Sequence, residues 1–127
     1  MIGLQSGTVR LFDHEREWEE EAQKTIFRLK NILGDIVKGA EHVGSTAILS
    51  IKAKPIIDIA LAVDNFDDII VYVNILRSNG FYYRPHAEID NQILFACGSL
   101  YDGSGNLQTH FIHVVKTDSM EWRNYIN

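Results

Sequence analysis

One apolar run, residues 55–63, constrains the fold of this chain more than any other feature. The run, Pro-Ile-Ile-Asp-Ile-Ala-Leu-Ala-Val, is broken only by Asp58. A nearly continuous apolar segment rich in β-branched residues is typical of a central strand buried on both faces of its sheet. Pro55 fits the first position of such a strand, because proline has no amide proton to donate to a neighbour.

Helices and further strands are predicted on both sides of this strand. Residues 15–37 are predicted to form a long helix, since Trp18 and Ala22 begin a series of apolar residues spaced three or four apart. Residues 66–78 are predicted to form a second helix, with Asn65 as its N-cap. The other predicted strands are residues 9–12, 38–43, 81–84, 92–97 and 109–115, and the other predicted helical segments are residues 46–51 and 120–125.

The order of these segments predicts an α/β (α+β) fold, a mixed sheet flanked by helices. Residues 92–115 are predicted to be a hairpin whose turn is the polar cluster at residues 101–106. Ser119 is predicted to cap the last helix. The chain has 127 residues, which fits one domain, and we expect residues 1–127 to form it.

Composition excludes several classes of protein. The formal net charge is −5, so non-specific nucleic-acid binding through a broad basic face is not expected. No apolar run approaches the length of a membrane span and no signal core opens the chain, so we expect a cytoplasmic protein without a membrane partner. The single cysteine, Cys97, excludes an intrachain disulfide, and its apolar neighbours favour a buried side chain over a nucleophile. The acidic balance still allows a local basic pocket, from Lys52, Lys54, Arg77 and Arg84.

A Gly-Ser turn follows the predicted strand at residues 38–43. Gly44 allows the backbone to turn and to approach a ligand closely. The amides of Ser45 and Thr46 would then face an anion from the first turn of a short helix, and the Ser45 hydroxyl adds a donor. Because Gly-Ser alone is a common loop, the turn predicts a phosphate site only in combination with a second feature.

Asp58 is that second feature. A carboxylate inside a buried strand is costly unless it is paired, protonated or bound to a metal. A salt bridge to Lys52 or Lys54 would satisfy it, whereas a functional role is favoured because such charges cluster at sites. Magnesium sites for nucleotidyl transfer use carboxylates together with substrate phosphates. The next residue on the same face of the strand is Ala60, so the second carboxylate is missing locally.

Histidines offer a different metal site. His110 and His113 lie three apart in one predicted strand and therefore face opposite sides of it. Each could simply be packed and hydrogen-bonded. If the strands are adjacent, Glu41 or His42 could meet Asp58 together with one of these two histidines. Such a mixed cluster would favour a transition metal over magnesium.

A patch of aromatic and basic residues, Tyr82-Tyr83-Arg84-Pro85-His86, could stack a nucleotide base. Simple packing next to a proline turn explains the same residues equally well, so both interpretations stay open.

Several segments together resemble the GrpB-like family. They are Glu41-His42-Val43-Gly44-Ser45-Thr46-Ala47, Ala53-Lys54-Pro55-Ile56-Ile57-Asp58-Ile59, Thr109-His110-Phe111-Ile112-His113-Val114-Val115, Asp13 to Trp18, and Ser119-Met120-Glu121-Trp122-Arg123. They occur in the family's order and span essentially the whole chain. That family is assigned to the nucleotidyltransferase superfamily, so the resemblance implies a mixed sheet flanked by helices. It also implies that Gly44 and Ser45 hold nucleotide phosphates and that Asp58 is the first metal-binding carboxylate.

The chain departs from the superfamily pattern at three points. Ala60 stands where the second carboxylate is expected. His113 stands where the third is expected, and Phe111 replaces a polar residue of many relatives. Relatives also continue with further helix, whereas this sequence stops at Asn127, which is compatible with a truncated C-terminus.

The leading hypothesis is a nucleotidyltransferase that moves a nucleotidyl group from a nucleoside triphosphate to the hydroxyl of an unknown acceptor. The residues expected to hold the nucleotide are Gly44, Ser45, Thr46 and Lys54. The expected ligands of the divalent metal (magnesium or manganese, with zinc as an alternative) are Asp58, Glu41, His42, His110 and His113. Asp58 and His113 would be catalytic, and Glu88 and Asp90 are reserve carboxylates. The alternatives are a non-catalytic, regulatory nucleotide-binding module, or a transition-metal site of histidines and carboxylates.

Overall fold

The structure is a computed structural model, and it describes residues 4–5, 16–44, 56–85 and 91–126. The strand predicted at residues 9–12 and the helical turn predicted at residues 46–51 lie outside these ranges. Within the four ranges, none of the helices has the length and apolar character needed to cross a membrane.

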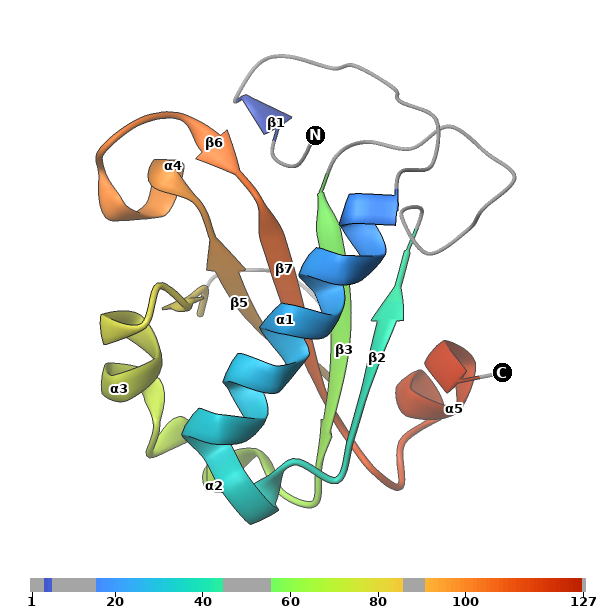
Figure 1. The fold of residues 1–127 in the computed structure, drawn as a ribbon. Coiled ribbons are helices and arrows are strands. Elements are labelled where there is room, and N and C mark those ends of the chain that lie inside the picture. The colour runs from blue at the N-terminus through green and yellow to red at the C-terminus, as the bar shows by residue number, and fades with distance from the viewer. Residues whose placement is uncertain (1–3, 6–15, 45–55, 86–90, 127) are drawn as a thin grey trace.

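Five strands form one mixed sheet in the order β2-β3-β7-β5-β4 (Figure 1). They are β2 (Gly39–Val43), β3 (Ile57–Val63), β4 (Tyr82–Tyr83), β5 (Ile93–Cys97) and β7 (His110–Lys116). β3 and β7 run parallel, and the other neighbouring pairs of this sheet are antiparallel. Two shorter strands, β1 (Leu4–Gln5) and β6 (Leu107–Gln108), pair separately.

The internal strand predicted from the long apolar run is β3. It lies between β2 and β7, and all its residues are buried except Asp58, which is half-buried. Burial on both faces explains why the run is apolar at successive positions rather than at alternate ones. The mixed sheet with helices on its faces confirms the predicted fold class.

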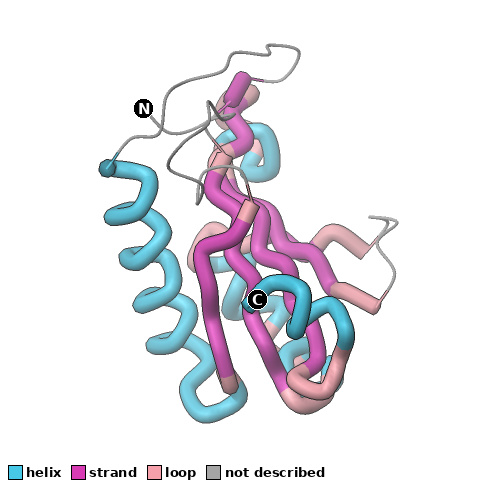
Figure 2. The backbone as a smooth tube through the Cα atoms, turned by 90° about the vertical axis from the view of Figure 1, so that its right-hand side faces the viewer, coloured by secondary structure: helices cyan, strands magenta, loops and turns pink. Residues whose placement is uncertain are grey.

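A long amphipathic helix, α1 (Arg16–Leu33), covers one face of the sheet (Figure 2). Its buried apolar residues are Trp18, Ala22, Ile26, Leu29 and Leu33, and they share one core with Ile57, Ile59, Leu61 and Val63 of β3. Burying one such side chain stabilises the fold by about 1.5–3 kcal/mol. α1 ends four residues before the predicted end, because Gly34 takes a left-handed conformation with φ of 63° and starts a short 3₁₀ helix, η1 (Gly34–Ile36).

The predicted helix at residues 66–78 is two helices, α2 (Phe66–Ile70) and α3 (Val73–Ser78). At the break, the Tyr72 amide donates to the carbonyl of Ile69, three residues back, at 2.9 Å. The consecutive β-branched residues at 69–71 lower helix propensity at this point. The prediction of one continuous helix was therefore wrong, although both pieces lie within its bounds.

The last helix, α5 (Met120–Ile126), lies on the face of the sheet opposite α1 (Figure 2). The Ser119 hydroxyl accepts the Trp122 amide at 3.1 Å, which confirms the predicted cap. The predicted hairpin is also present, since β5 and β7 pair antiparallel. Its connection is longer than a turn and contains α4 (Ser99–Asp102) and β6.

Candidate functional site

Strand register sorts the predicted site residues onto the two faces of the sheet. On β2, Val43 is opposite Asp58 and Glu41 is opposite Ala60. On β7, His113 pairs with Ala60. Because paired residues on neighbouring strands point to the same face, Glu41, Asp58 and His113 all face the side that carries α5.

Asp58 and His113 are in direct contact on this face. The Asp58 Oδ1 atom lies 3.0 Å from His113 Nε2, and the two side chains are 26% and 18% exposed. An ionised carboxylate can only accept a hydrogen bond, so the imidazole donates to it. The structure thus brings together the two residues that the sequence singled out as catalytic.

Gly44, the residue that follows β2, approaches the same carboxylate. Gly44 has a φ of 76°, a left-handed conformation that favours glycine. A Cβ atom built on Gly44 would lie 2.7 Å from Asp58 Oδ2, so only a glycine allows this approach. The other predicted residues of the phosphate site, Ser45, Thr46 and Lys54, lie outside the described residues, as do Lys52, Glu88 and Asp90.

Two residues that the sequence did not reveal extend the contact between Asp58 and His113. His113 Nδ1 lies 3.2 Å from Gln92 Oε1, and Gln92 Nε2 donates to the Tyr125 hydroxyl at 3.2 Å. The rings of His113 and Tyr125 have centroids 6.1 Å apart. The chain of polar contacts therefore runs from β3 across β7 to the residue before β5 and to α5.

The face that carries Asp58 also carries one further carboxylate, Glu41, beside Ala60. Ala60, which lacks the second carboxylate, has Glu41 beside it on one strand and His113 on the other. Magnesium is usually bound by one or two carboxylates together with water and substrate phosphates. Asp58 and Glu41 share this face but are not register partners, because Asp58 pairs with Val43 and Glu41 with Ala60. Within the described residues, no group of three or more His, Cys, Asp or Glu could hold a metal.

His42 and His110 point to the opposite face, because they pair with residues of β3 that lie in the core beneath α1. His42 Nδ1 lies 2.7 Å from Glu19 Oε2 on α1. The structure therefore separates both histidines from Asp58, and the predicted mixed cluster with either of them does not form there.

His110 is buried in a polar contact beneath α1. Its Nε2 atom lies 3.1 Å from Thr25 Oγ1 and 3.3 Å from Glu21 Oε1, and its Nδ1 atom lies 2.8 Å from Thr109 Oγ1. Burial lowers the pKa of His110 below its usual value of 6.5, and the nearby Glu21 carboxylate opposes this effect only in part. The interpretation of a packed, hydrogen-bonded histidine fits this residue.

Cys97 is buried, and desolvation raises the pKa of its thiol to about 12. A thiol with so high a pKa is a poor nucleophile at neutral pH. The structure agrees with the prediction of a small buried side chain.

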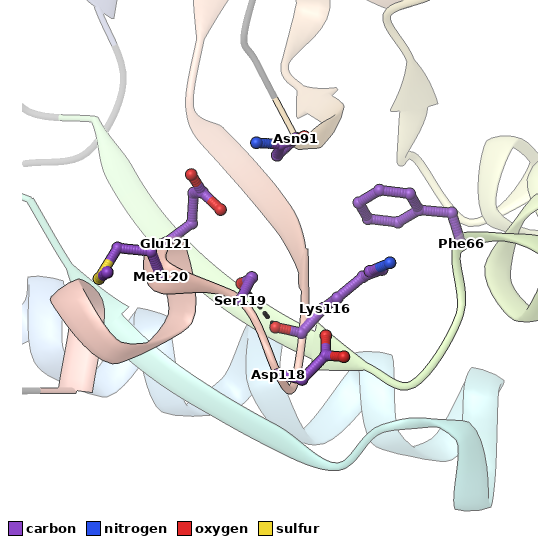
Figure 3. Close-up of a pocket in the computed structure, with 7 residues that line it drawn as sticks. All are labelled: Phe66, Asn91, Lys116, Asp118, Ser119, Met120 and Glu121. Atoms are coloured by element: carbon purple, nitrogen blue, oxygen red, sulfur yellow. Dashed lines mark hydrogen bonds between the residues drawn. The ribbon is translucent and has the colours of Figure 1, made fainter.

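A cavity of about 350 Å³ lies where β7 turns into α5 (Figure 3). Lys116, Ser119 and Glu121 line it from the chain around this turn, and Asn91 faces them from the segment before β5. Neither Asp58 nor His113 lines it. The cavity is therefore separate from the site built on Gly44 and Asp58.

Fold and site together define a class of protein: a mixed-sheet domain in which a glycine turn, an aspartate and a histidine meet on one face. Comparison with known proteins then identifies the family. The sequence profile of the family described as GrpB protein matches residues 8–127. The chain belongs to the GrpB family, which confirms the resemblance seen in its sequence.

Individual relatives agree with this assignment. The chain is 34% identical over 128 residues to the glutamate-rich protein GrpB of Alkalihalophilus pseudofirmus, across 100% of this chain and 72% of that protein. It is 33% identical over 79 residues to a UPF0157 protein of Halalkalibacterium halodurans, across 62% of this chain and 40% of that protein. The crystal structure of the conserved protein GrpB from Enterococcus faecalis shares the fold with a TM-score of 0.79 at 22% identity, over 90% of this chain and 66% of that one. This chain spans only part of each of these relatives.

Proposed function

We propose that this protein binds a nucleoside triphosphate at the turn after β2 and transfers its nucleotidyl group to the hydroxyl of an acceptor. The observation that carries the proposal is the approach of Gly44 to Asp58. A Cβ atom on Gly44 would lie 2.7 Å from Asp58 Oδ2, so backbone and carboxylate meet without a side chain between them. A phosphate-binding turn beside a metal-binding carboxylate requires such an approach.

In this proposal the turn after β2 holds the phosphates. The amides of Ser45 and Thr46, which follow Gly44 in the sequence, donate to phosphate oxygens, and Lys54 adds a positive charge. These roles follow the resemblance to the nucleotidyltransferase superfamily, in which a Gly-Ser turn holds the nucleotide.

Asp58 is the proposed metal ligand, and His113 is a positioning residue for it. His113 donates to Oδ1, which directs the other oxygen, Oδ2, toward Gly44. Glu41 is the proposed second carboxylate, because it lies beside Ala60 on the same face. A divalent metal bound here would neutralise the triphosphate and polarise the α-phosphate.

The proposed reaction is an in-line displacement at the α-phosphorus. The bond from phosphorus to the acceptor oxygen forms as the bond to pyrophosphate breaks, and the hydroxyl proton is released to water. The turn after β2 fixes the position of the phosphates. The contact between His113 and Asp58 keeps the carboxylate aimed at them.

A second candidate function is nucleotide binding without catalysis. Ala60 occupies the position of the second carboxylate in the superfamily pattern and is fully buried. The acidic pair on this face would then depend on Glu41, an exposed residue on a different strand. With a single well-ordered carboxylate, binding would serve a regulatory role.

Calorimetric titration with ATP, GTP, CTP and UTP, with and without magnesium or manganese, tests the proposed site. We expect metal-dependent binding that is lost in Ser45→Ala and in Asp58→Asn. Asp35→Asn is the matched control, because Asp35 is an exposed aspartate in η1. Failure of all four nucleotides to bind would contradict both candidate functions.

Release of pyrophosphate separates the two candidates. The protein, a triphosphate that it binds and a pool of hydroxyl-bearing metabolites are incubated together. Release by the native protein, absent in Asp58→Asn, supports nucleotidyl transfer. Tight binding without release supports the regulatory module.

A further inference from the structure

A second cavity, of about 340 Å³, lies at the edge of the sheet among α3, β4 and α4. These three elements lie together on one side of the molecule, away from α5 (Figure 1). The residues that matter for its chemistry are Asn74, Arg77, Tyr82, Tyr83, Arg84 and Tyr101. Its volume is in the range of small-molecule sites, about 300–1,000 Å³.

The charge of this cavity is opposite to that of the whole chain. Arg77 and Arg84 both line it, and no carboxylate of the described residues does. Neither arginine forms a salt bridge with a carboxylate in the described part of the chain. In a protein with a net charge of −5, two guanidinium groups in one cavity, with no acidic neighbour among the described residues, point to an anionic ligand.

Arg84 is held in a geometry that suits a phosphate. Its Cζ atom lies over the Tyr101 ring, 4.9 Å from the centroid, within the range of a cation–π contact. A cation–π contact does not use up the five N–H donors of a guanidinium, which can still bind an anion. Two parallel donors of this kind bind phosphate oxygens in a bidentate manner.

The aromatic lining suits a flat ring. Three tyrosines line the cavity, all of them half-buried, and Tyr83 is also fixed against Phe95 with ring centroids 5.5 Å apart. Burial raises the pKa of Tyr101, so its hydroxyl stays protonated and can donate. Aromatic side chains next to a cation are the combination that binds nucleic-acid bases by stacking.

We infer that this cavity binds a nucleoside monophosphate, with the phosphate on Arg77 and Arg84 and the base against the tyrosines. The site is separate from the one on Asp58, because the two share no residue. The cavity beside α5 also contains a cation and an aromatic ring, but Asp118 and Glu121 line it too, whereas none of the described residues that line this cavity is a carboxylate.

The sheet connects this cavity to Asp58. Tyr82 pairs with Ala96, Ala96 with Phe111, and Phe111 with Asp58, so the four residues form one row on the same face. Three strand spacings separate the ends of the row, about 14 Å. If the proposed nucleotidyl transfer holds, the nucleotide in this cavity is the acceptor, placed along the sheet from the triphosphate.

Calorimetric titration of the native protein with AMP, adenosine and inorganic phosphate tests the inference. We expect AMP to bind at least about tenfold more tightly than either fragment, because both halves of the cavity contribute. Arg77→Gln and Arg84→Gln should each lower the affinity for AMP by about tenfold or more. Arg123→Gln, an exposed arginine on α5, is the control and should leave AMP affinity unchanged.

The other outcomes are also decisive. Asp58→Asn should leave AMP affinity unchanged, since it disables only the proposed triphosphate site. If AMP binding is lost in Asp58→Asn but unchanged in both arginine variants, the nucleotide binds at Asp58. That result would overturn the inference while supporting the proposed function. Phosphate that binds as tightly as AMP would overturn the role of the tyrosines. No binding of AMP would overturn the inference whatever the triphosphate titration gives.

Discussion

Asp58 Oδ1 and His113 Nε2 lie 3.0 Å apart, although the strand register does not pair these two residues. Asp58 pairs with Phe111, and His113 pairs with Ala60, two residues further along both strands. The side chain of Ala60 is a methyl group, which leaves room for the imidazole to lean back toward the carboxylate. Ala60 stands where the superfamily pattern has its second carboxylate. Its small side chain also permits the contact between His113 and Asp58.

The contact between Asp58 and His113 should be measurable as a coupling free energy. In a double-mutant cycle of Asp58→Asn and His113→Gln, we expect a coupling of about 1–3 kcal/mol, because the hydrogen bond is charged and largely shielded from water. Urea unfolding of the four proteins gives the values. The control cycle is Asp64→Asn with Lys38→Gln, an exposed pair 4.0 Å apart whose coupling should be below about 1 kcal/mol. Equal couplings in the two cycles would contradict the special role of the Asp58 contact.

Gly44→Ala should destabilise the protein more than the same change at Gly34. Both glycines have left-handed backbones, with φ of 76° and 63°, and a residue with a Cβ costs about 1–2 kcal/mol in that conformation. A Cβ on Gly44 meets Asp58 Oδ2 at 2.7 Å, whereas one on Gly34 meets nothing within 4 Å. Thermal unfolding of the two variants therefore separates the cost of the left-handed backbone, which both share, from the cost of the clash with Asp58. Equal losses of stability in the two variants would mean that Asp58 moves aside freely.

The packing of α5 on the sheet depends on a missing side chain at Gly39. A Cβ built there would lie 2.5 Å from Trp122 Cζ2 and 2.9 Å from its Cη2 atom. We expect Gly39→Ala to cost about 1–3 kcal/mol by overpacking and to shift the tryptophan emission as α5 moves. Phenylalanine lacks the outer atoms of the indole ring. In a Trp122→Phe background, Gly39→Ala should therefore cost much less.

Local patterns were enough to predict much of the fold. The period of the apolar residues revealed α1, and the nearly continuous apolar run revealed β3 as an internal strand. The three-residue spacing of His110 and His113 predicted that they face opposite sides, and the register confirms it. These features depend on a few neighbouring residues, so a single sequence contains them.

Features that depend on strand order could not be predicted in this way. Gln92 contacts His113 and Tyr125, which lie 21 and 33 residues further along the chain, and nothing in the sequence near Gln92 indicates either contact. Register alone decides that Glu41 shares a face with Asp58 while His42 does not. The sequence left both residues open because it did not show which strands are neighbours.

Cys97 should resist thiol reagents in the folded protein. Its side chain is buried, and desolvation raises the pKa of the thiol to about 12, so the reactive thiolate is scarce at pH 8. We expect a thiol-reactive chromogenic disulfide to label the native protein only at the rate of unfolding, and to label it at once in denaturant. Prompt labelling of the native state would contradict the buried position.

Stability should fall as the solution is acidified below neutral pH, because His110 is buried in its neutral form. Burial lowers the pKa of His110 in the folded protein below the value of 6.5 expected in the unfolded chain, against the opposing charge of Glu21. The unfolded state therefore binds the proton more readily. The stabilisation is complete above pH 6.5 and is lost as pH falls through the folded-state pKa.

Urea unfolding of the native protein and of His110→Gln at several values between pH 7 and pH 5 isolates this effect from that of the carboxylates. We expect the native protein to lose more stability over this range than His110→Gln, whose side chain has no proton to gain. In Glu21→Gln the loss should be steeper, because the carboxylate that favours the charged imidazole is gone while Thr25 and Thr109 remain. Parallel pH profiles for the native protein and His110→Gln would show that His110 does not titrate differently on folding.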